Sequence, residues 1–143
     1  MNVVRNHATL ALQAHVDELR RAAGWLHAEA GARAVPDEAI GRLDLCLHEA
    51  LANILDHSGL AADATLQLAL HLQPGSATLT LLDSGHPYDP TMAPAPARPT
   101  TLADTLPGGL GVVMLRSQAD QLAYEHRDGS NQLQITVRWG EAA

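Results

Sequence analysis

The chain has 143 residues and a formal net charge of −7, with one Cys and nine basic residues that are all Arg. Its length suits one compact domain, so we expect residues 1–143 to fold as a single unit. The absence of Lys excludes a P-loop nucleotidase and a eukaryotic-type protein kinase, and the acidic charge argues against a nucleic-acid partner. Cys46 alone can form neither an internal disulfide framework nor a Cys-rich zinc site. The sequence shows no signal peptide and no apolar run long enough to cross a membrane, so we expect a cytoplasmic protein.

The first third of the chain predicts a short strand followed by two helices. Residues 8–12 read as the strand. Apolar residues then recur every three or four positions, which predicts an amphipathic helix from about Ala14 to Ala30. A second helix is expected from about Pro36 to Ser58, with Gly59 ending it.

The remaining elements predict a sheet. Residues 65–73 and 77–83 alternate with a period of two, which predicts an antiparallel hairpin across Pro74-Gly75. A helix over about 111–120 and a second hairpin from 122–127 and 132–139 are expected near the end of the chain. This element order predicts an α+β fold, with helices on one side of a mostly antiparallel sheet.

Residues 86–107 form an expected long loop between these elements. They hold six of the eight prolines and show no sustained periodicity. Loops of roughly 20 residues inside a compact domain are uncommon, and they usually serve as functional lids or are disordered.

The second predicted helix carries the first candidate site. Glu49 and Asn53 are four residues apart, so they share one face of the helix. Asn is a weak helix former in a helix interior, so its position calls for an explanation. One interpretation is a functional pair, and the other is a solvent-exposed polar face. A metal site using His48, His57 or His86 is disfavoured, because no i,i+4 His pair and no further Cys support it.

The second candidate lies at the end of the strand 77–83. Asp83 and Gly85 follow a run of buried-type residues. Asp83 could accept a hydrogen bond from a ligand amine, while Gly85 allows the backbone to approach closely. The alternative is an ordinary turn in which Asp83 caps the chain and Gly85 supplies a positive φ.

The third candidate is the segment Gly108-Gly109-Leu110-Gly111, at the start of the predicted helix. Glycines at a helix N-terminus offer free N–H groups to phosphate. The segment lacks the third Gly of the dinucleotide-binding fingerprint, and the alternative interpretation is a flexible hinge.

Together these features resemble the GHKL (Bergerat-fold) ATPases, and among them the bacterial anti-sigma-factor serine-protein kinases. The resemblance rests on HEALANILDHSG at 48–59, LLDSGHPYDP at 81–90 and PGGLGVVMLRSQADQLAYEHRDGSNQLQITVRW at 107–139. It covers nearly the whole chain and is weakest over 1–35. It implies a two-layer α+β sandwich of the Bergerat (histidine-kinase-like ATPase) type, with a mixed, mostly antiparallel sheet, helices on one face and an ATP lid at about 86–107.

The resemblance also implies ATP and Mg²⁺ as cofactors, with a role for each candidate residue. Glu49 would be the general base, and Asn53 would hold Mg²⁺ between the ATP phosphates. Asp83 would accept from the adenine amino group, and Gly85 would shape the pocket wall. Backbone amides would approach the phosphates from Gly108, Gly109, Leu110 and Gly111.

The function implied by the resemblance is an ATP-dependent serine/threonine-protein kinase of a partner-switching module. It would phosphorylate a STAS-type antagonist protein, sequester a sigma factor or an equivalent regulator, and form a homodimer. One alternative is a nucleotide-binding regulator that sequesters its partner without phosphate transfer. Another is an ATPase, or a histidine-kinase-like domain acting on His.

Two residues depart from the family pattern. Asp56 lies one turn beyond Asn53, where an acid could repel phosphate or assist the metal. Arg98 is the one basic residue of the expected lid.

Overall fold

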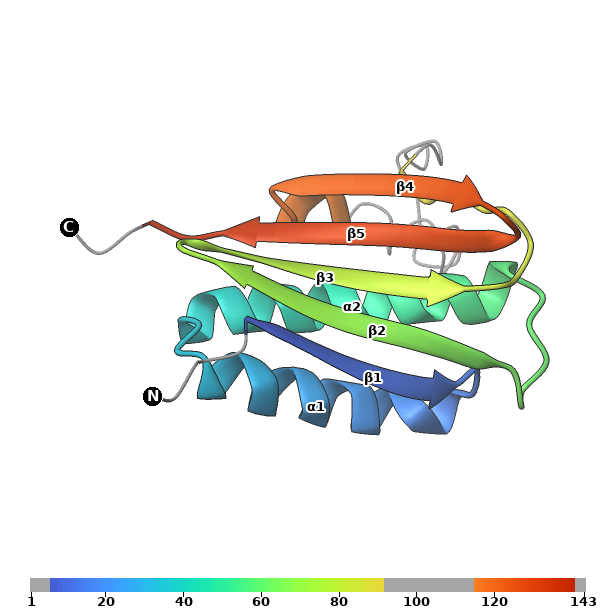
Figure 1. The fold of residues 1–143 in the computed structure, drawn as a ribbon, viewed down its shortest axis with the longest axis horizontal. Helices are drawn as coiled ribbons and strands as arrows, with labels where there is room; N and C mark the ends of the chain where they lie inside the picture. Colours follow the sequence, from blue (N-terminus) through green and yellow to red (C-terminus); the bar gives the residue numbers. More distant parts are fainter. Residues whose placement is uncertain (1–5, 92–114, 141–143) are drawn as a thin grey trace, which may run out of the picture.

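The computed structural model describes residues 6–91 and 115–140. Five strands form one sheet in the order β1-β2-β3-β5-β4, and two long helices cover one of its faces (Figure 1). Every pair of neighbouring strands is antiparallel, so the sheet of the described residues is wholly antiparallel rather than mixed. The elements are β1 His7–Gln13, a 3-10 helix η1 Val16–Glu18, α1 Leu19–Ala32, α2 Asp37–His57, β2 Thr65–Gln73, β3 Ser76–Asp83, β4 Gln121–Arg127 and β5 Ser130–Arg138.

The first helix begins later than the apolar spacing predicts. The expected start at Ala14 is wrong, because the backbone N–H of Ala14 donates to the Ala64 carbonyl at 2.8 Å beside the start of β2. His15 then accepts from the backbone N–H of Asp17 through Nδ1, which begins the 3-10 turn. Regular α-helix follows only from Leu19, so local side-chain and sheet contacts override the helical period here.

The two hairpins agree with the sequence pattern. β2 spans the predicted residues 65–73, and β3 begins one residue before its predicted start. In the second hairpin, Asp128 and Gly129 have φ values of 54° and 78°, which is the left-handed pair expected of a tight two-residue turn between strands. Of the predicted helix over 111–120, residues 115–118 are helical and 111–114 lie outside the described residues.

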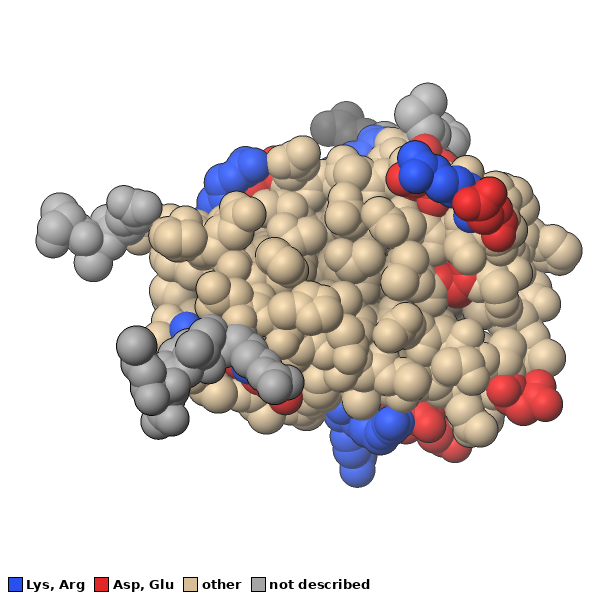
Figure 2. All heavy atoms as spheres, viewed as in Figure 1, with Lys and Arg blue, Asp and Glu red and all other residues tan. Residues whose placement is uncertain are grey.

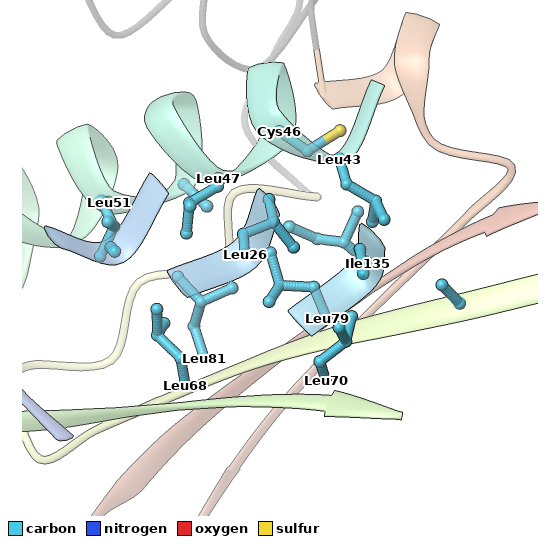
Figure 3. Close-up of a cluster of buried hydrophobic side chains, with 14 of the residues drawn as sticks. Leu26, Leu43, Cys46, Leu47, Leu51, Leu68, Leu70, Leu79, Leu81 and Ile135 are labelled. Atoms are coloured by element: carbon cyan, nitrogen blue, oxygen red, sulfur yellow. The ribbon is translucent and has the colours of Figure 1, made fainter. Parts of the chain in front are cut away.

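The core lies between the helices and the sheet and is almost entirely aliphatic. Figure 3 shows leucines of α1 and α2 pointing at leucines of β2 and β3 and at Ile135 of β5. Cys46 lies in this core, and its burial raises the pKa of the thiol to about 11. This thiol is therefore a protonated packing group at neutral pH.

The opposite face of the sheet is left open. Along β1, β2 and β3 its outward residues alternate with the buried ones and include no Asp, Glu, Lys or Arg. Charged side chains surround this face mainly at its rim (Figure 2). Thr, Gln, Ala and His make up most of its middle, so the open face is polar and carries few charged side chains.

An ion-pair brace fastens α2 to the far edge of the sheet. The Asp120 carboxylate accepts from the backbone N–H of Arg138 at 2.5 Å and from Nη2 of Arg42 at 3.0 Å. These donors hold the pKa of Asp120 below its ordinary value, against the opposing effect of desolvation. Arg42 also donates to the carbonyls of Gln118 and Arg138, so the brace positions the segment that leads into β4.

Candidate functional site

The C-terminal half of α2 buries a polar side chain that the helical period places at the surface. Asn53 is 4% exposed, so its assignment to a solvent-exposed face is wrong. The small residues Cys46 and Ala50 precede it at helical spacing and are buried as well. Because these small side chains pack tightly, α2 buries a wider arc than its leucines alone indicate. Glu49 is partly exposed one turn earlier.

The side-chain nitrogen of Asn53 differs from the other buried polar groups of the described residues. Its Nδ2 atom is buried and has no hydrogen-bond partner among the described residues. A buried amide without a partner costs roughly 1–3 kcal/mol, and native proteins keep few such groups without a reason. The unpaired amide lines a pocket, so we interpret it as a group that awaits a ligand.

The carboxylate at the end of β3 is held from two sides. Asp83 is 6% exposed, and its Oδ1 accepts from the backbone N–H of Gly85 at 2.8 Å and from Nδ2 of Asn131 at 2.9 Å. The bond from Gly85 is the turn contact of the structural interpretation. Both hydrogen bonds to this carboxylate are accepted by Oδ1, so Oδ2 has no partner in the described part of the chain. The turn and a ligand-binding role are therefore compatible.

Gly85 is required for space and not for its backbone angle. Its φ is outside the positive range, so the expectation of a positive φ is wrong. A Cβ atom at this position would lie 2.5 Å from both the Cβ and the carbonyl oxygen of Ser58. The backbone N–H of His86 donates to that same carbonyl at 2.7 Å. Glycine thus lets the loop after β3 lie directly against the end of α2 and form the pocket wall.

One pocket brings the α2 and β3 residues together. Its free volume of about 20 Å³ is room for about one water molecule, so a larger ligand needs the surrounding loop to move. Asn53 and Asp83 both line it, whereas Glu49 does not. The lining residues are Ala50, Asn53, Ile54, Ser58, Asp83, His86, Tyr88, Pro90, Tyr124, Asn131 and Leu133.

Two aromatic residues of this pocket were not anticipated from the sequence. The Tyr88 ring stacks on His57 of α2, with centroids 4.2 Å apart and planes inclined by 16°. Tyr124 of β4 donates its hydroxyl to Oδ1 of Asn131 and accepts from the backbone N–H of Tyr88 at 3.2 Å. Burial is the main cause that raises the pKa of Tyr124 above its ordinary value, so its hydroxyl stays protonated. Asn131 pairs directly with Asp83 in the β3–β5 register, which joins strands far apart in the sequence, so no local pattern marks it as a site residue.

Other candidates lie partly or wholly outside the described residues. Gly108, Gly109, Leu110 and Gly111 belong to that part of the chain, as do Arg98 and the expected lid beyond residue 91. Asp56 is exposed on the last turn of α2. Over residues 6–91 and 115–140, no group of three or more His, Cys, Asp or Glu could hold a metal ion. No helix there is long and apolar enough to cross a membrane.

Residues 12–139 match the family described as the histidine kinase-like ATPase domain. The chain therefore belongs to this family, which confirms the GHKL resemblance and the α+β fold class. It is 38% identical over 95 residues to the serine/threonine-protein kinase BtrW of Bordetella bronchiseptica, in an alignment that covers 66% of this chain and 67% of that protein.

A solved structure has the same fold. The chain matches "The crystal structure of the RsbU and RsbW domains of Rv1364c from Mycobacterium tuberculosis", with a TM-score of 0.67 and 16% sequence identity. The match covers 94% of this chain and 32% of that one, so this chain spans about a third of the solved chain's length. At this identity the likeness shows the fold.

Proposed function

We propose that this chain is an ATP-dependent serine/threonine-protein kinase that phosphorylates a STAS-type antagonist protein. The observation that carries the proposal is the buried, unpaired Asn53 amide in a pocket shared with the Asp83 carboxylate. Membership of an ATPase family and similarity to a protein named as a serine/threonine kinase support it.

The residues of the pocket fit adenine at one end. Asp83 is a buried residue whose Oδ2 has no hydrogen-bond partner among the described residues, so this oxygen can accept from the 6-amino group of adenine. Because Gly85 has no Cβ, the loop beside this carboxylate can pack directly against Ser58. We assign both residues to adenine binding, with residues 86–107 as the ATP lid and residues 1–143 as one kinase domain.

Asn53 fits the phosphate end. The Asn side chain can turn its carbonyl oxygen toward a cation, and Mg²⁺ is held by few protein oxygens together with phosphates and water. The lack of a carboxylate and His cluster in the described residues is compatible with such a site. We assign the Mg²⁺ contact to Asn53, and phosphate contacts to the backbone of Gly108, Gly109, Leu110 and Gly111.

Phosphoryl transfer needs few reacting groups from the protein. Bound MgATP supplies the transferable phosphoryl group and the neutralising charge. Glu49 is partly exposed one turn before Asn53, so its carboxylate can take the proton of an incoming Ser or Thr hydroxyl. Glu49 and Asn53 lie one turn apart on the same helix. The helix therefore sets the position of the proposed general base relative to the residue proposed to contact the nucleotide.

The activity is tested with purified chain, labelled ATP, Mg²⁺ and a candidate STAS protein. We expect acid-stable phosphate on the acceptor, and a transfer rate at least about 100-fold lower in Glu49→Gln with ATP affinity unchanged. Glu38→Gln, which alters an exposed acid on the same helix, is the matched control.

Three other results would contradict the proposal. Equal transfer rates for wild type and Glu49→Gln would show that Glu49 is not the general base. Nucleotide binding without transfer would favour the regulator that only sequesters its partner. Acid-labile phosphate would favour transfer to His.

The regulated partner is proposed to be a sigma factor or an equivalent regulator, bound by a homodimer of this chain. The open sheet face supports self-association, because its β1, β2 and β3 residues include no Asp, Glu, Lys or Arg, so two copies that meet there bring no like-charged side chains of these strands into direct contact. Sedimentation should give a dimer for wild type and a monomer for Thr80→Arg, whose position lies in the middle of that face. Ala28→Arg places the same charge on the exposed side of α1 and should remain dimeric.

A further inference from the structure

Asn131 occupies a special position relative to Asp83. The two residues face each other directly in the β3–β5 pairing, and both are buried. Nδ2 of Asn131 lies 2.9 Å from Oδ1 of Asp83, 3.2 Å from the Gly85 carbonyl and 2.9 Å from the His86 carbonyl. All three are acceptors, so this amide nitrogen ties the carboxylate and the following loop to β5.

The orientation of the Asn131 amide is determined by its surroundings. Its Oδ1 receives the Tyr124 hydroxyl and lies 3.0 Å from Nδ1 of His126. The Tyr124 oxygen already accepts from the backbone N–H of Tyr88, so its own proton points to Asn131. A flipped amide would place Oδ1 against three acceptors. One arrangement therefore satisfies the network, with N–H directed at Asp83.

This network decides which oxygen of Asp83 faces a ligand. Gly85 and Asn131 both donate to Oδ1, which leaves Oδ2 as the oxygen that can accept from a ligand in the pocket. Without Asn131, a single turn contact would hold the carboxylate, and its rotation would no longer be restricted. A fixed acceptor distinguishes a 6-amino purine from a 6-oxo purine, because the oxo group offers no proton there.

We propose that Asn131 is the positioning residue that makes the pocket selective for 6-amino over 6-oxo purine nucleotides, and that Tyr124 fixes its orientation. The inference rests on the proposed nucleotide binding and goes further, because it assigns base selectivity to a side chain of β5. Asn131 acts through Asp83 and through the loop after β3.

The test compares the affinities of ATP and inosine triphosphate by calorimetry at pH 8. Wild type should prefer ATP, and Asn131→Ala should lose about tenfold in ATP affinity with less than a twofold change for inosine triphosphate. Tyr124→Phe should give a smaller loss of selectivity. Gln132→Ala removes the neighbouring amide of the same strand, on the opposite face of the sheet, and should leave the preference unchanged.

A second variant separates positioning from folding. Asn131→Asp places a carboxylate against Asp83, and the two must share a proton to be buried together. Its preference for ATP should therefore be weak at pH 8 and recover toward pH 6, as the shared proton replaces the amide donor. Asn131→Ala should show no recovery, and both variants should keep a cooperative thermal transition.

The outcomes are distinct. An equal loss of both nucleotides in Asn131→Ala, or equal wild-type affinity for the two, would overturn the inference. Absence of any nucleotide binding by wild type would instead overturn the proposed function.

Discussion

The two ends of the pocket contrast in how their polar groups are satisfied. At the β3 end, Asp83 receives two donors and Asn131 is held in turn by Tyr124. At the α2 end, Asn53 is equally buried, yet its Nδ2 makes no hydrogen bond within the described residues. The protein's own hydrogen bonds preorganise the β3 end. The α2 end instead holds a buried N–H group that has no hydrogen-bond partner in the described residues.

This difference is informative because unsatisfied buried polar groups destabilise a protein. The network around Asp83 is complete without a ligand, so the acceptor oxygen of Asp83 is already oriented. Such a fixed acceptor favours selection among ligands by the position of their donor groups. An unpaired amide nitrogen favours a role completed from outside, either by a ligand acceptor such as a phosphate oxygen or by a cation once the amide turns its oxygen toward it. The contrast therefore predicts that substitutions at the two ends have different effects on stability and binding.

The largest effect should follow from Asp83→Asn. The new amide can keep its oxygen toward Gly85 and Asn131, so the fold should be retained. Its nitrogen then occupies the place of Oδ2 and presents a donor to the donor of the adenine 6-amino group. We expect ATP affinity to fall at least about 100-fold, since a mismatched buried pair is rejected strongly.

Calorimetric titration with MgATP measures this loss, and circular dichroism checks the fold. A variant that binds ATP within threefold of wild type, with an unchanged thermal transition, would show that Asp83 is a turn residue only.

Gly85→Ala should have the next largest effect, and its effect is on stability. The added Cβ would meet the Ser58 carbonyl at 2.5 Å, and that carbonyl is fixed because it accepts from the His86 N–H. Backbone must therefore shift, which should lower the free energy of unfolding by about 2 kcal/mol. Urea denaturation measures the change.

Gly41→Ala is the matched control for this substitution. Gly41 lies within α2, and a Cβ there meets nothing within 4 Å. Removing a helix-interior glycine should raise the free energy of unfolding by about 0.5–1 kcal/mol. If both variants changed stability in the same direction, close packing of the loop on α2 would not explain Gly85.

Periodicity alone predicted the strand 65–73 and the long second helix, whereas only the resemblance to the GHKL ATPases implied that Asn53 and Asp83 belong to one site. These features depend on residues near one another in the chain, or on motifs at element ends. The start of α1 depends on a contact between Ala14 and Ala64, so the helical period could not place it.

The missing parts of the site have a similar explanation. Asn131 becomes a site residue only through the β3–β5 register, which joins strands far apart in the sequence. Tyr124 then enters the site because the β4–β5 hairpin places its hydroxyl against Asn131. The burial of Asn53 depends on the small side chains of Cys46 and Ala50, which allow close packing of α2. A count of large apolar residues does not include them.

Asn53→Leu should have the smallest effect on affinity and the opposite effect on stability. Nothing in the described protein bonds to the Asn53 Nδ2 atom, and Leu is a better helix former than Asn, so the free energy of unfolding should stay equal or rise. Affinity for ATP with Mg²⁺ should fall about tenfold, the size expected for losing one polar contact to a charged group. Affinity measured in a chelator should change little.

Ile54→Val is the control, because it changes the volume of the same pocket without changing its polar groups. Ile54→Val should keep the wild-type difference between the ATP affinity measured with Mg²⁺ and the ATP affinity measured in a chelator. A loss of stability in Asn53→Leu would mean that the amide is satisfied within the protein after all. A buried polar group that is kept for a ligand lowers the stability of the free protein, and this cost is offset only when the ligand binds. A satisfied Asn53 amide would not follow this rule, so the contrast between the two ends of the pocket would then not reflect ligand binding.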